Sequence, residues 1–303
     1  MDSVISVKSL TKYYGDFLAL SNISFSVQKG EIFGLIGPNG AGKSTTMRSI
    51  LNFIKPSDGE IKINGFDSKR DYLKIRNFIG YLPGEFSIYD NLNGEQYIKH
   101  ILHLRKQPEK LSNLKTLASR FDLDLSKKSK HLSKGNKQKI GIIQAFCHDP
   151  EIVILDEPTS GLDPLKQHEF DNLVLEFKEK GKTIFISSHV LPEVEALCDK
   201  VAIIKEGKII AEDKVSDLKK KSLNRIEVNF AKDFVIEKFP KNTGVSKITG
   251  NSKRYTFDIE GNINAFIKAL SEYEIQSIRT MDPDLEEIFL SYYGDKEPNN
   301  DVK

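Results

Sequence analysis

A glycine-rich loop near the N-terminus separates two stretches of different pattern. Residues 32–36 form an apolar run typical of a buried strand, and residues 46–53 have helical spacing. The loop follows the pattern G-x-x-x-x-G-K-S and reads Gly37, Pro38, Asn39, Gly40, Ala41, Gly42, Lys43, Ser44 and Thr45. A strand, this loop and a helix in that order predict an α/β fold with a phosphate-binding loop.

The residue types in the loop suit a triphosphate. Glycines at 37, 40 and 42 remove side chains, so that backbone N–H groups can surround the phosphate oxygens. Lys43 supplies a positive charge, Ser44 a hydroxyl for Mg²⁺, and the following helix directs its positive dipole end at the same oxygens. A glycine-rich turn without a ligand is the alternative, but the flanking strand and helix favour an ATP and Mg²⁺ site.

Length and composition narrow the possible classes. The 303 residues are long for one core and suit two domains, and 45 basic against 43 acidic residues give a net charge of +2. No nucleic-acid partner is expected from so balanced a charge. The two cysteines, Cys147 and Cys198, are too few for a disulfide framework or a zinc site. No apolar run is long enough for a membrane span, and the acidic start does not resemble a signal peptide, so a cytoplasmic location is expected.

The segments around the loop predict a small β-region. Residues 4–10 and 23–27 alternate between apolar and polar, and residues 60–64 do so again. Between the first two lies a turn with Tyr13 and Tyr14, either of which could stack on an adenine ring or pack in the core. Residues 76–82 are expected to form a buried strand that ends at Gly84.

A helical lobe is predicted over about residues 84–145, where the apolar spacing becomes helical and the faces are charged. Ser133 is well placed as the N-cap of a helix running to Cys147. By spacing alone, this segment could be no more than a capped helix.

Two further strands end in polar side chains. A predicted strand that starts at Glu151 and is apolar over residues 152–155 leads into Asp156 and Glu157, and residues 182–188 lead into His189. Open parallel sheets bind ligands at such strand ends. Asp156 suits Mg²⁺ as an oxygen ligand, and Glu157 could orient and deprotonate an attacking water. A solvated turn for the carboxylates and a structural role for the histidine are the alternatives.

Taken in order, these motifs resemble those of the ATP-binding cassette (ABC) ATPases. They are the glycine-rich loop, Leu132-Ser133-Lys134-Gly135-Asn136, the Asp156-Glu157 strand end, Ser160-Gly161-Leu162-Asp163 and His189. The resemblance covers roughly residues 1–220. It implies a P-loop NTPase with a RecA-like core, an antiparallel β-subdomain and the helical lobe. It also implies a head-to-tail homodimer that holds two ATP molecules between its subunits.

The resemblance assigns roles to single residues. Tyr14 would stack on adenine, with Tyr13 as the alternative, and His189 would contact the γ-phosphate. Lys43, Glu157 and His189 would form the catalytic group, with Mg²⁺ held by Ser44 and Asp156.

Three further residues act between subunits in this family. Ser133 and the Gly135 N–H would hold the partner's ATP, and Asp163 would couple the two sites.

The chain departs from the family pattern at two places. Lys134 and Asn136 stand at the third and fifth positions, where the usual Leu-Ser-Gly-Gly-Gln has Gly and Gln. Gly84 stands where a glutamine usually touches Mg²⁺ and relays motion to the membrane subunit. Whether Glu85 substitutes for that glutamine is open.

These departures, together with the tail at residues 285–290, look like the ATP-binding subunits of bacterial multidrug and antibiotic exporters. In that group an integral membrane permease is a separate chain, so this protein would lie on the inner face of the cell membrane. The permease is expected to dock near Phe86 and Tyr89, taken as exposed aromatic residues.

The remainder reads as a small α+β accessory domain over residues 221–294 with a flexible tail at 295–303. Strands are expected at 226–230, 245–248, 255–259 and 275–279, with helices at 234–239, 263–272 and 285–293. This order is close to a ferredoxin-like unit. It carries no catalytic spacing, which favours a structural or regulatory role.

Two other functions remain open. One is a soluble ABC ATPase that acts on ribosomes or nucleic acid, although such proteins usually carry two cassettes or large insertions. The other is a degenerate cassette that binds ATP only as a scaffold, an option that Gly84 keeps open and that Glu157 and His189 disfavour.

Overall fold

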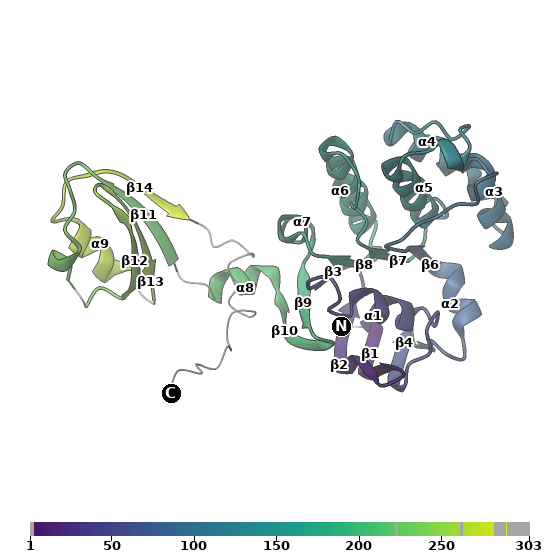
Figure 1. The fold of residues 1–303 in the computed structure, drawn as a ribbon, viewed down its shortest axis with the longest axis horizontal. Coiled ribbons are helices and arrows are strands. Elements are labelled where there is room, and N and C mark those ends of the chain that lie inside the picture. The colour runs from purple at the N-terminus through teal and green to yellow at the C-terminus, as the bar shows by residue number, and fades with distance from the viewer. Residues whose placement is uncertain (1–2, 222–223, 241, 261–262, 282–288, 290–303) are drawn as a thin grey trace. The chain divides into compact units, whose positions relative to one another are not determined.

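The computed structural model describes residues 3–221, 224–240, 242–260, 263–281 and 289. It divides into two compact units, Met1–Lys214 and Val215–Lys303 (Figure 1). The boundary expected at residue 220 falls inside helix α8 (Val215–Lys221), which belongs to the second unit.

A six-stranded sheet forms the centre of the first unit. Its order is β10-β9-β3-β8-β7-β6, parallel except for β10, which pairs antiparallel with β9. The strands are β3 (Ile32–Ile36), β6 (Ile79–Leu82), β7 (Ile152–Asp156), β8 (Thr183–Ser188), β9 (Lys200–Lys205) and β10 (Lys208–Lys214). Every residue of β3, β7 and β8 is buried, which explains their continuous apolar runs. The predicted α/β class is confirmed.

A four-stranded antiparallel sheet lies beside this core. Its order is β2-β1-β4-β5, and it comprises β1 (Ser3–Tyr14), β2 (Phe17–Gln28), β4 (Asp58–Ile63) and β5 (Phe66–Asp67). Helix α1 (Lys43–Ile50) contacts β7 of one sheet and β2 of the other. The rings of Phe25, Phe33 and Phe185 meet with centroids 5.4 to 5.8 Å apart, so both sheets share one hydrophobic core.

The predicted strand over 76–82 is only half right. Residues 76–78 end helix α2 (Tyr72–Phe78), and β6 begins at Ile79. Of the residues of α2, only Ile75 is buried, so this short helix lies on the surface of the unit and is anchored there by one side chain.

The helical lobe consists of α3 (Gly94–Leu104), η1 (Pro108–Lys110), α4 (Leu111–Arg120), η2 (Ser129–His131) and α5 (Lys134–Phe146). Asn93 and Gln96 form a capping box at the start of α3. Ser133 caps α5 as predicted, because its hydroxyl accepts a hydrogen bond from the Asn136 N–H at 3.2 Å.

Two helices cover the other side of the central sheet from α1, as Figure 1 shows. They are α6 (Pro164–Glu179) and α7 (Leu191–Leu197). The helix α6 begins at its N-cap, Asp163, whose side chain accepts a hydrogen bond from the Lys166 N–H. This N-cap ends the segment 157–162 that follows β7.

The described part of the second unit contains α8, an antiparallel sheet of order β12-β13-β11-β14 and the helix α9 packed against this sheet. These elements are β11 (Asn224–Phe230), β12 (Val245–Asn251), β13 (Arg254–Ile259), α9 (Asn264–Leu270) and β14 (Ile275–Met281). The helix predicted over 234–239 is wrong, since only a 3₁₀ turn, η3 (Ile236–Lys238), forms there. Phe234 and Phe239 instead pack into an aromatic core with Phe230 and Phe257. The predicted helix over 285–293, except residue 289, and the tail lie outside the described residues.

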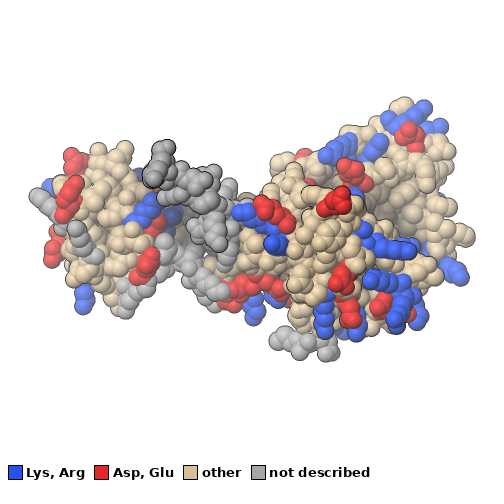
Figure 2. Space-filling view, turned by 60° about the horizontal axis from the view of Figure 1, so that its bottom comes forward, with Lys and Arg blue, Asp and Glu red and all other residues tan. Residues whose placement is uncertain are grey.

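Basic and acidic side chains are interspersed on the face drawn in Figure 2. Among the residues that the structure describes, no helix combines the length and the apolar character needed to cross a membrane.

Candidate functional site

The glycine-rich loop follows β3 and ends where Lys43 begins α1. The Lys43 Nζ donates to the carbonyls of Gly37 (2.7 Å) and Pro38 (3.1 Å), and it lies 3.2 Å from Oε1 of Glu157. The whole Lys43 residue is 5% exposed. The Lys43 ammonium group is therefore held in place inside the loop by three oxygen atoms.

Glycine is required at both ends of this loop. A Cβ at Gly37 would lie 2.4 Å from the Ile204 carbonyl of β9, and Gly42 has a φ of 110°. Ala41, within the loop, is buried, and its carbonyl accepts a hydrogen bond from the Gly207 N–H at 3.0 Å. The loop is therefore fixed against β9 and the turn that follows it.

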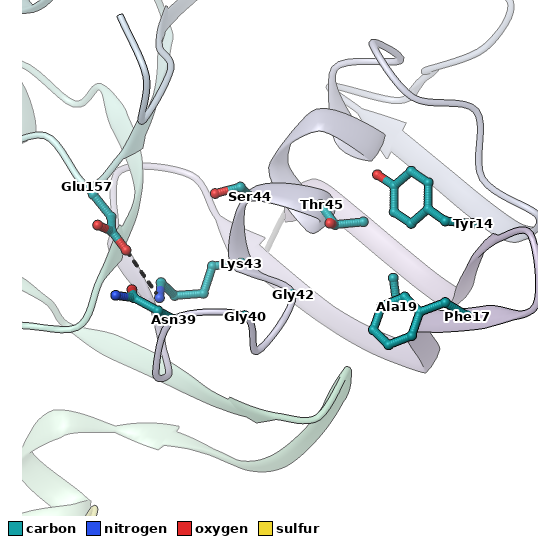
Figure 3. A pocket seen from close by; sticks show the side chains of 10 residues that line it. All are labelled: Tyr14, Phe17, Ala19, Asn39, Gly40, Gly42, Lys43, Ser44, Thr45 and Glu157. Carbon is teal, nitrogen blue, oxygen red and sulfur yellow. Dashed lines mark ion pairs between the residues drawn. The ribbon is translucent and has the colours of Figure 1, made fainter.

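A cavity of about 200 Å³ opens above this loop (Figure 3). It is lined by Tyr14, Phe17, Ala19, Asn39, Gly40, Gly42, Lys43, Ser44, Thr45 and Glu157. Figure 3 shows the Tyr14 and Phe17 rings at one end and the Lys43–Glu157 ion pair at the other. The cavity thus has an aromatic end and a charged end, separated by the loop.

Sequence reasoning missed part of the aromatic end. Phe17 is 67% exposed and faces Tyr14 across the β1–β2 hairpin, and Ala19 follows on the same strand. Tyr13 does not belong to the set of described residues that line the cavity. Side chains alternate along a strand, so Tyr14 and its cross-strand partner Phe17 could have been identified from the hairpin turn at Gly15.

Asp156 ends β7 in a fully buried position. Its Oδ1 accepts a hydrogen bond from the Ser187 hydroxyl at 2.6 Å, whereas its Oδ2 is buried with no hydrogen-bond partner among the described residues. Burial, and then the charge of Asp156, raises the pKa of Tyr81 to about 12, so this phenol stays protonated. A buried carboxylate oxygen without a donor is a fitting ligand for a cation.

Glu157 has a left-handed backbone, with a φ of 48°. Its N–H donates to both the carbonyl and the hydroxyl oxygen of Ser187, each at 3.2 Å. Its Oε1 lies 3.4 Å from Nδ1 of His189 as well as beside Lys43. The structure therefore brings all three predicted catalytic side chains together.

The segment around His189 is held by its neighbours. The Ser188 hydroxyl donates to Oε2 of Glu193 (2.8 Å) and accepts from the Val190 N–H (2.9 Å). Burial raises the pKa of Glu193, and the nearby hydroxyls of Ser188 and Thr159 oppose that shift.

Gly84 lies directly against Asp156. A Cβ at this position would be 3.2 Å from Oδ2 and 3.3 Å from Cγ of Asp156. Glu85 is exposed. Because Gly84 has no side chain, the space beside the unpartnered oxygen is left free of a Cβ.

Ser133, Gly135 and Asp163 lie in a second cluster. A Cβ on Gly135 would be 2.6 Å from the Gly161 carbonyl, so the start of α5 packs closely on the segment that leads to Asp163. The Gln138 side-chain amide also donates to the Pro158 carbonyl at 2.8 Å. None of the three lines the cavity as the described residues define it.

Groups that could hold a metal on their own are absent: the described ranges contain no cluster of three or more His, Cys, Asp and Glu. Ser44 lines the cavity and Asp156 offers one free oxygen, so a cation here needs further oxygen atoms from a ligand.

Comparison with known proteins gives consistent results. The family described as ABC transporter matches residues 20–160. The probable multidrug ABC transporter ATP-binding protein YbhF of Escherichia coli (strain K12) is 39% identical over 234 residues, which are 74% of this chain and 39% of YbhF. The chain therefore spans less than half the length of that relative. The bacitracin transport ATP-binding protein BcrA of Bacillus licheniformis is 38% identical over 234 residues, or 75% of each chain.

Solved structures with the same fold include two cassettes. One, described as the ATP-binding subunit of an ABC transporter, has a TM-score of 0.68 and 34% identity, covering 72% of this chain and 93% of its own. The other is a dimeric post-hydrolysis state of the ATP-binding cassette MJ0796 with ADP and Pi, with a TM-score of 0.63 and 25% identity. The match covers 70% of this chain and 98% of that one.

Proposed function

The chain belongs to the ABC transporter ATP-binding proteins, and we propose that it binds and hydrolyses ATP to drive a separate membrane permease of an exporter. One observation carries the hydrolytic part. Lys43 Nζ and His189 Nδ1 approach the same oxygen of Glu157, at 3.2 and 3.4 Å, beside a phosphate-sized loop. A carboxylate that can orient water and a cation for the phosphates are parts that phosphoryl transfer to water uses, and His189 lies beside them at the carboxyl end of β8.

Each side chain then has one task. Lys43 and the loop N–H groups bind the β- and γ-phosphates, which would draw the ammonium away from its present carbonyl partners. Glu157 orients and deprotonates the attacking water, and His189 contacts the γ-phosphate. At the aromatic end, Tyr14 stacks on adenine, with Phe17 beside it.

Mg²⁺ fits the remaining donors. The Ser44 hydroxyl and the free Oδ2 of Asp156 would hold it, together with phosphate oxygens. When bound, the cation neutralises charge that develops on the phosphates.

We infer that the active unit is a head-to-tail dimer. Ser133, Gly135 and Asp163 are not among the described residues that line the cavity around Lys43, so we propose that they serve an ATP bound to another subunit. The MJ0796 structures, which are described as dimeric, support a dimer, because that cassette matches 70% of this chain.

The exporter assignment rests on relatives. YbhF and BcrA are named for multidrug and bacitracin transport, and their similarity supports an export role at the inner face of the membrane. The strand order of the second unit, β14-β11-β13-β12, is that of a split βαβ unit, so we propose a ferredoxin-like accessory domain in which η3 replaces the first helix.

The test is to replace Lys43 with alanine. The loop loses its dedicated cation, so ATP binding or hydrolysis should be lost. Fluorescent-nucleotide titration and phosphate release should be measured beside Lys62→Ala, which removes an exposed lysine of β4. Equal turnover in Lys43→Ala and the parent would refute the assignment.

A further inference from the structure

Ser187 is a fully buried polar residue at the carboxyl end of β8. It follows the apolar residues Ile184, Phe185 and Ile186, where a further apolar residue would be expected in a strand buried on both faces. In the parallel register it lies directly opposite Asp156 of β7. A hydroxyl at this depth needs partners, and both of its contacts are with the proposed site.

The first contact fixes the Asp156 carboxylate. Ser187 Oγ donates to Oδ1 at 2.6 Å, a short distance typical of hydrogen bonds to a charged oxygen. With Oδ1 occupied, only Oδ2 remains without a donor, and it lies on the side of Gly84. The serine therefore selects which oxygen Asp156 presents.

The second contact fixes the backbone of Glu157. Ser187 Oγ and the Ser187 carbonyl together accept the Glu157 N–H, each at 3.2 Å. A left-handed conformation at a residue other than glycine is costly and persists only where neighbours hold it. The same hydroxyl thus joins the carboxylate of one residue to the peptide of the next.

We propose that Ser187 is a positioning residue that sets the geometry of Asp156 toward Mg²⁺ and of Glu157 toward water. This inference rests on the proposed ATPase function and goes beyond it, since Ser187 is not one of the described residues that line the cavity and acts only through Asp156 and Glu157. It makes metal affinity, rather than nucleotide affinity, the property that depends on Ser187.

The experiment measures Mn²⁺ binding to the complex of the full chain with AMP-PNP, by electron paramagnetic resonance with protein in excess over nucleotide. Ser187→Ala leaves Oδ1 of Asp156 buried without a donor. Loss of an outer partner of a metal ligand typically costs 10–100-fold in metal affinity, and that shift is expected here. Affinity for AMP-PNP in EDTA should be unchanged, because the loop and Lys43 are intact.

Thr183→Val is the matched control. Thr183 is also buried on β8, and its hydroxyl accepts the Gly30 N–H at 2.9 Å, at the opposite end of the strand from Asp156. It should cost stability without changing Mn²⁺ affinity. If Ser187→Ala fails to fold, Ser187→Cys keeps the volume with a weaker donor and should also bind Mn²⁺ less tightly.

Three results would overturn the proposal. Parent-like Mn²⁺ affinity in Ser187→Ala, or in a folded Ser187→Cys, would leave the ATP site standing and remove only the role of Ser187. Equal losses in Ser187→Ala and Thr183→Val would make the serine merely structural. A parent protein whose AMP-PNP complex binds no Mn²⁺ would refute the metal site and this inference together.

Discussion

Gly84 shows how one residue changes the surroundings of Asp156. A Cβ at 3.2 Å from Oδ2 is tighter than most contacts, so any side chain here must shift the carboxylate or bond to it. In Gly84→Gln the amide can donate to the free oxygen. We expect unchanged ATP affinity and altered turnover.

Comparing Gly84→Gln with Gly84→Ala separates the effect of the Cβ contact with Asp156 from that of the amide hydrogen bond, because alanine adds only the contact. ATP turnover and AMP-PNP affinity are the measurements. If both variants match the parent in turnover and in transport, position 84 is only a turn.

At this scale the sequence identified most of the cavity. Six of the nine predicted loop residues line it, because a motif with fixed spacing dictates their placement, and so do Tyr14 and Glu157. Gly37, Pro38 and Ala41 are not among the described residues that line it. Phe17 and Ser187 were missed for a physical reason. Phe17 is found only when the hairpin turn at Gly15 is used to pair it with Tyr14, a step beyond apolar spacing. Ser187 meets Asp156 across a parallel pair of strands far apart in the chain, which the sequence does not reveal.

Among the elements, the helical lobe is joined to α6 by charged side chains. Arg120, the last residue of α4, donates to both oxygens of Glu176 at 2.7 and 2.8 Å, and its Nε pairs with Glu169. The hydrogen bonds from Arg120 lower the pKa of Glu176 below its ordinary value of 4.5. A carboxyl with a lowered folded-state pKa stabilises the fold above its unfolded pKa and loses that effect as pH falls through the folded value.

We therefore expect Arg120→Met to lower the free energy of unfolding by about 1 kcal/mol at pH 7, the upper range for exposed pairs. The difference from the parent should shrink below pH 4.5. Urea unfolding at several pH values tests this. Lys99→Met is the control, because its pair with Glu95 is exposed on both sides and should contribute little. A pH-independent difference would show that packing, not the ion pair, joins the lobe to α6.

Element types were predicted best where burial is one-sided or complete. β3, β7 and β8 were predicted correctly from their apolar runs. Residues 76–78 were misassigned because α2 passes directly into β6 at Ile79 and neither Phe78 nor Ile79 at that boundary is a turn residue. Residues 234–239 were misassigned because apolar residues in a short segment fit a strand, a helix or an irregular turn equally well. Phe234 and Phe239 are buried by the aromatic core that they share with Phe257, which long-range packing decides.

At the scale of the whole molecule, the proposed membrane permease needs a surface on which to dock. Phe86 and Tyr89 were both expected to be exposed, and only Tyr89 is. Tyr89 is 72% exposed, whereas Phe86 is half-buried, its ring edge-on to Tyr97 with the centroids 5.8 Å apart.

Tyr89→Ser should therefore release the permease while ATP binding is retained, because it removes exposed apolar area without disturbing the core. Co-purification of the integral membrane partner is the measurement. Leu73→Ser, which removes a 64% exposed residue of α2, is the control. Retained co-purification in Tyr89→Ser would move the interface elsewhere.

The dimer gives the most demanding test, because one substitution must change both rate and association. Glu157→Gln keeps the shape of the side chain and leaves Asp156 in place, but it removes the proposed base. General-base catalysis supplies roughly two to four decades of rate, so hydrolysis should fall by that amount while ATP binding survives. Glu151→Gln, at the opposite end of β7, should hydrolyse at the parent rate.

Unhydrolysed ATP then bridges Lys43 of one subunit and the Ser133–Gly135 segment of the other, and it stabilises the dimer by mass action. On a sizing column with light scattering, Glu157→Gln should run as a dimer in ATP and as a monomer in ADP. Adding Ser133→Arg should abolish the dimer, because an arginine at the α5 N-cap fills the interface without blocking the cavity of its own subunit. A Glu157→Gln protein that stays monomeric in saturating ATP would refute the head-to-tail arrangement, and one that hydrolyses at the parent rate would refute the base.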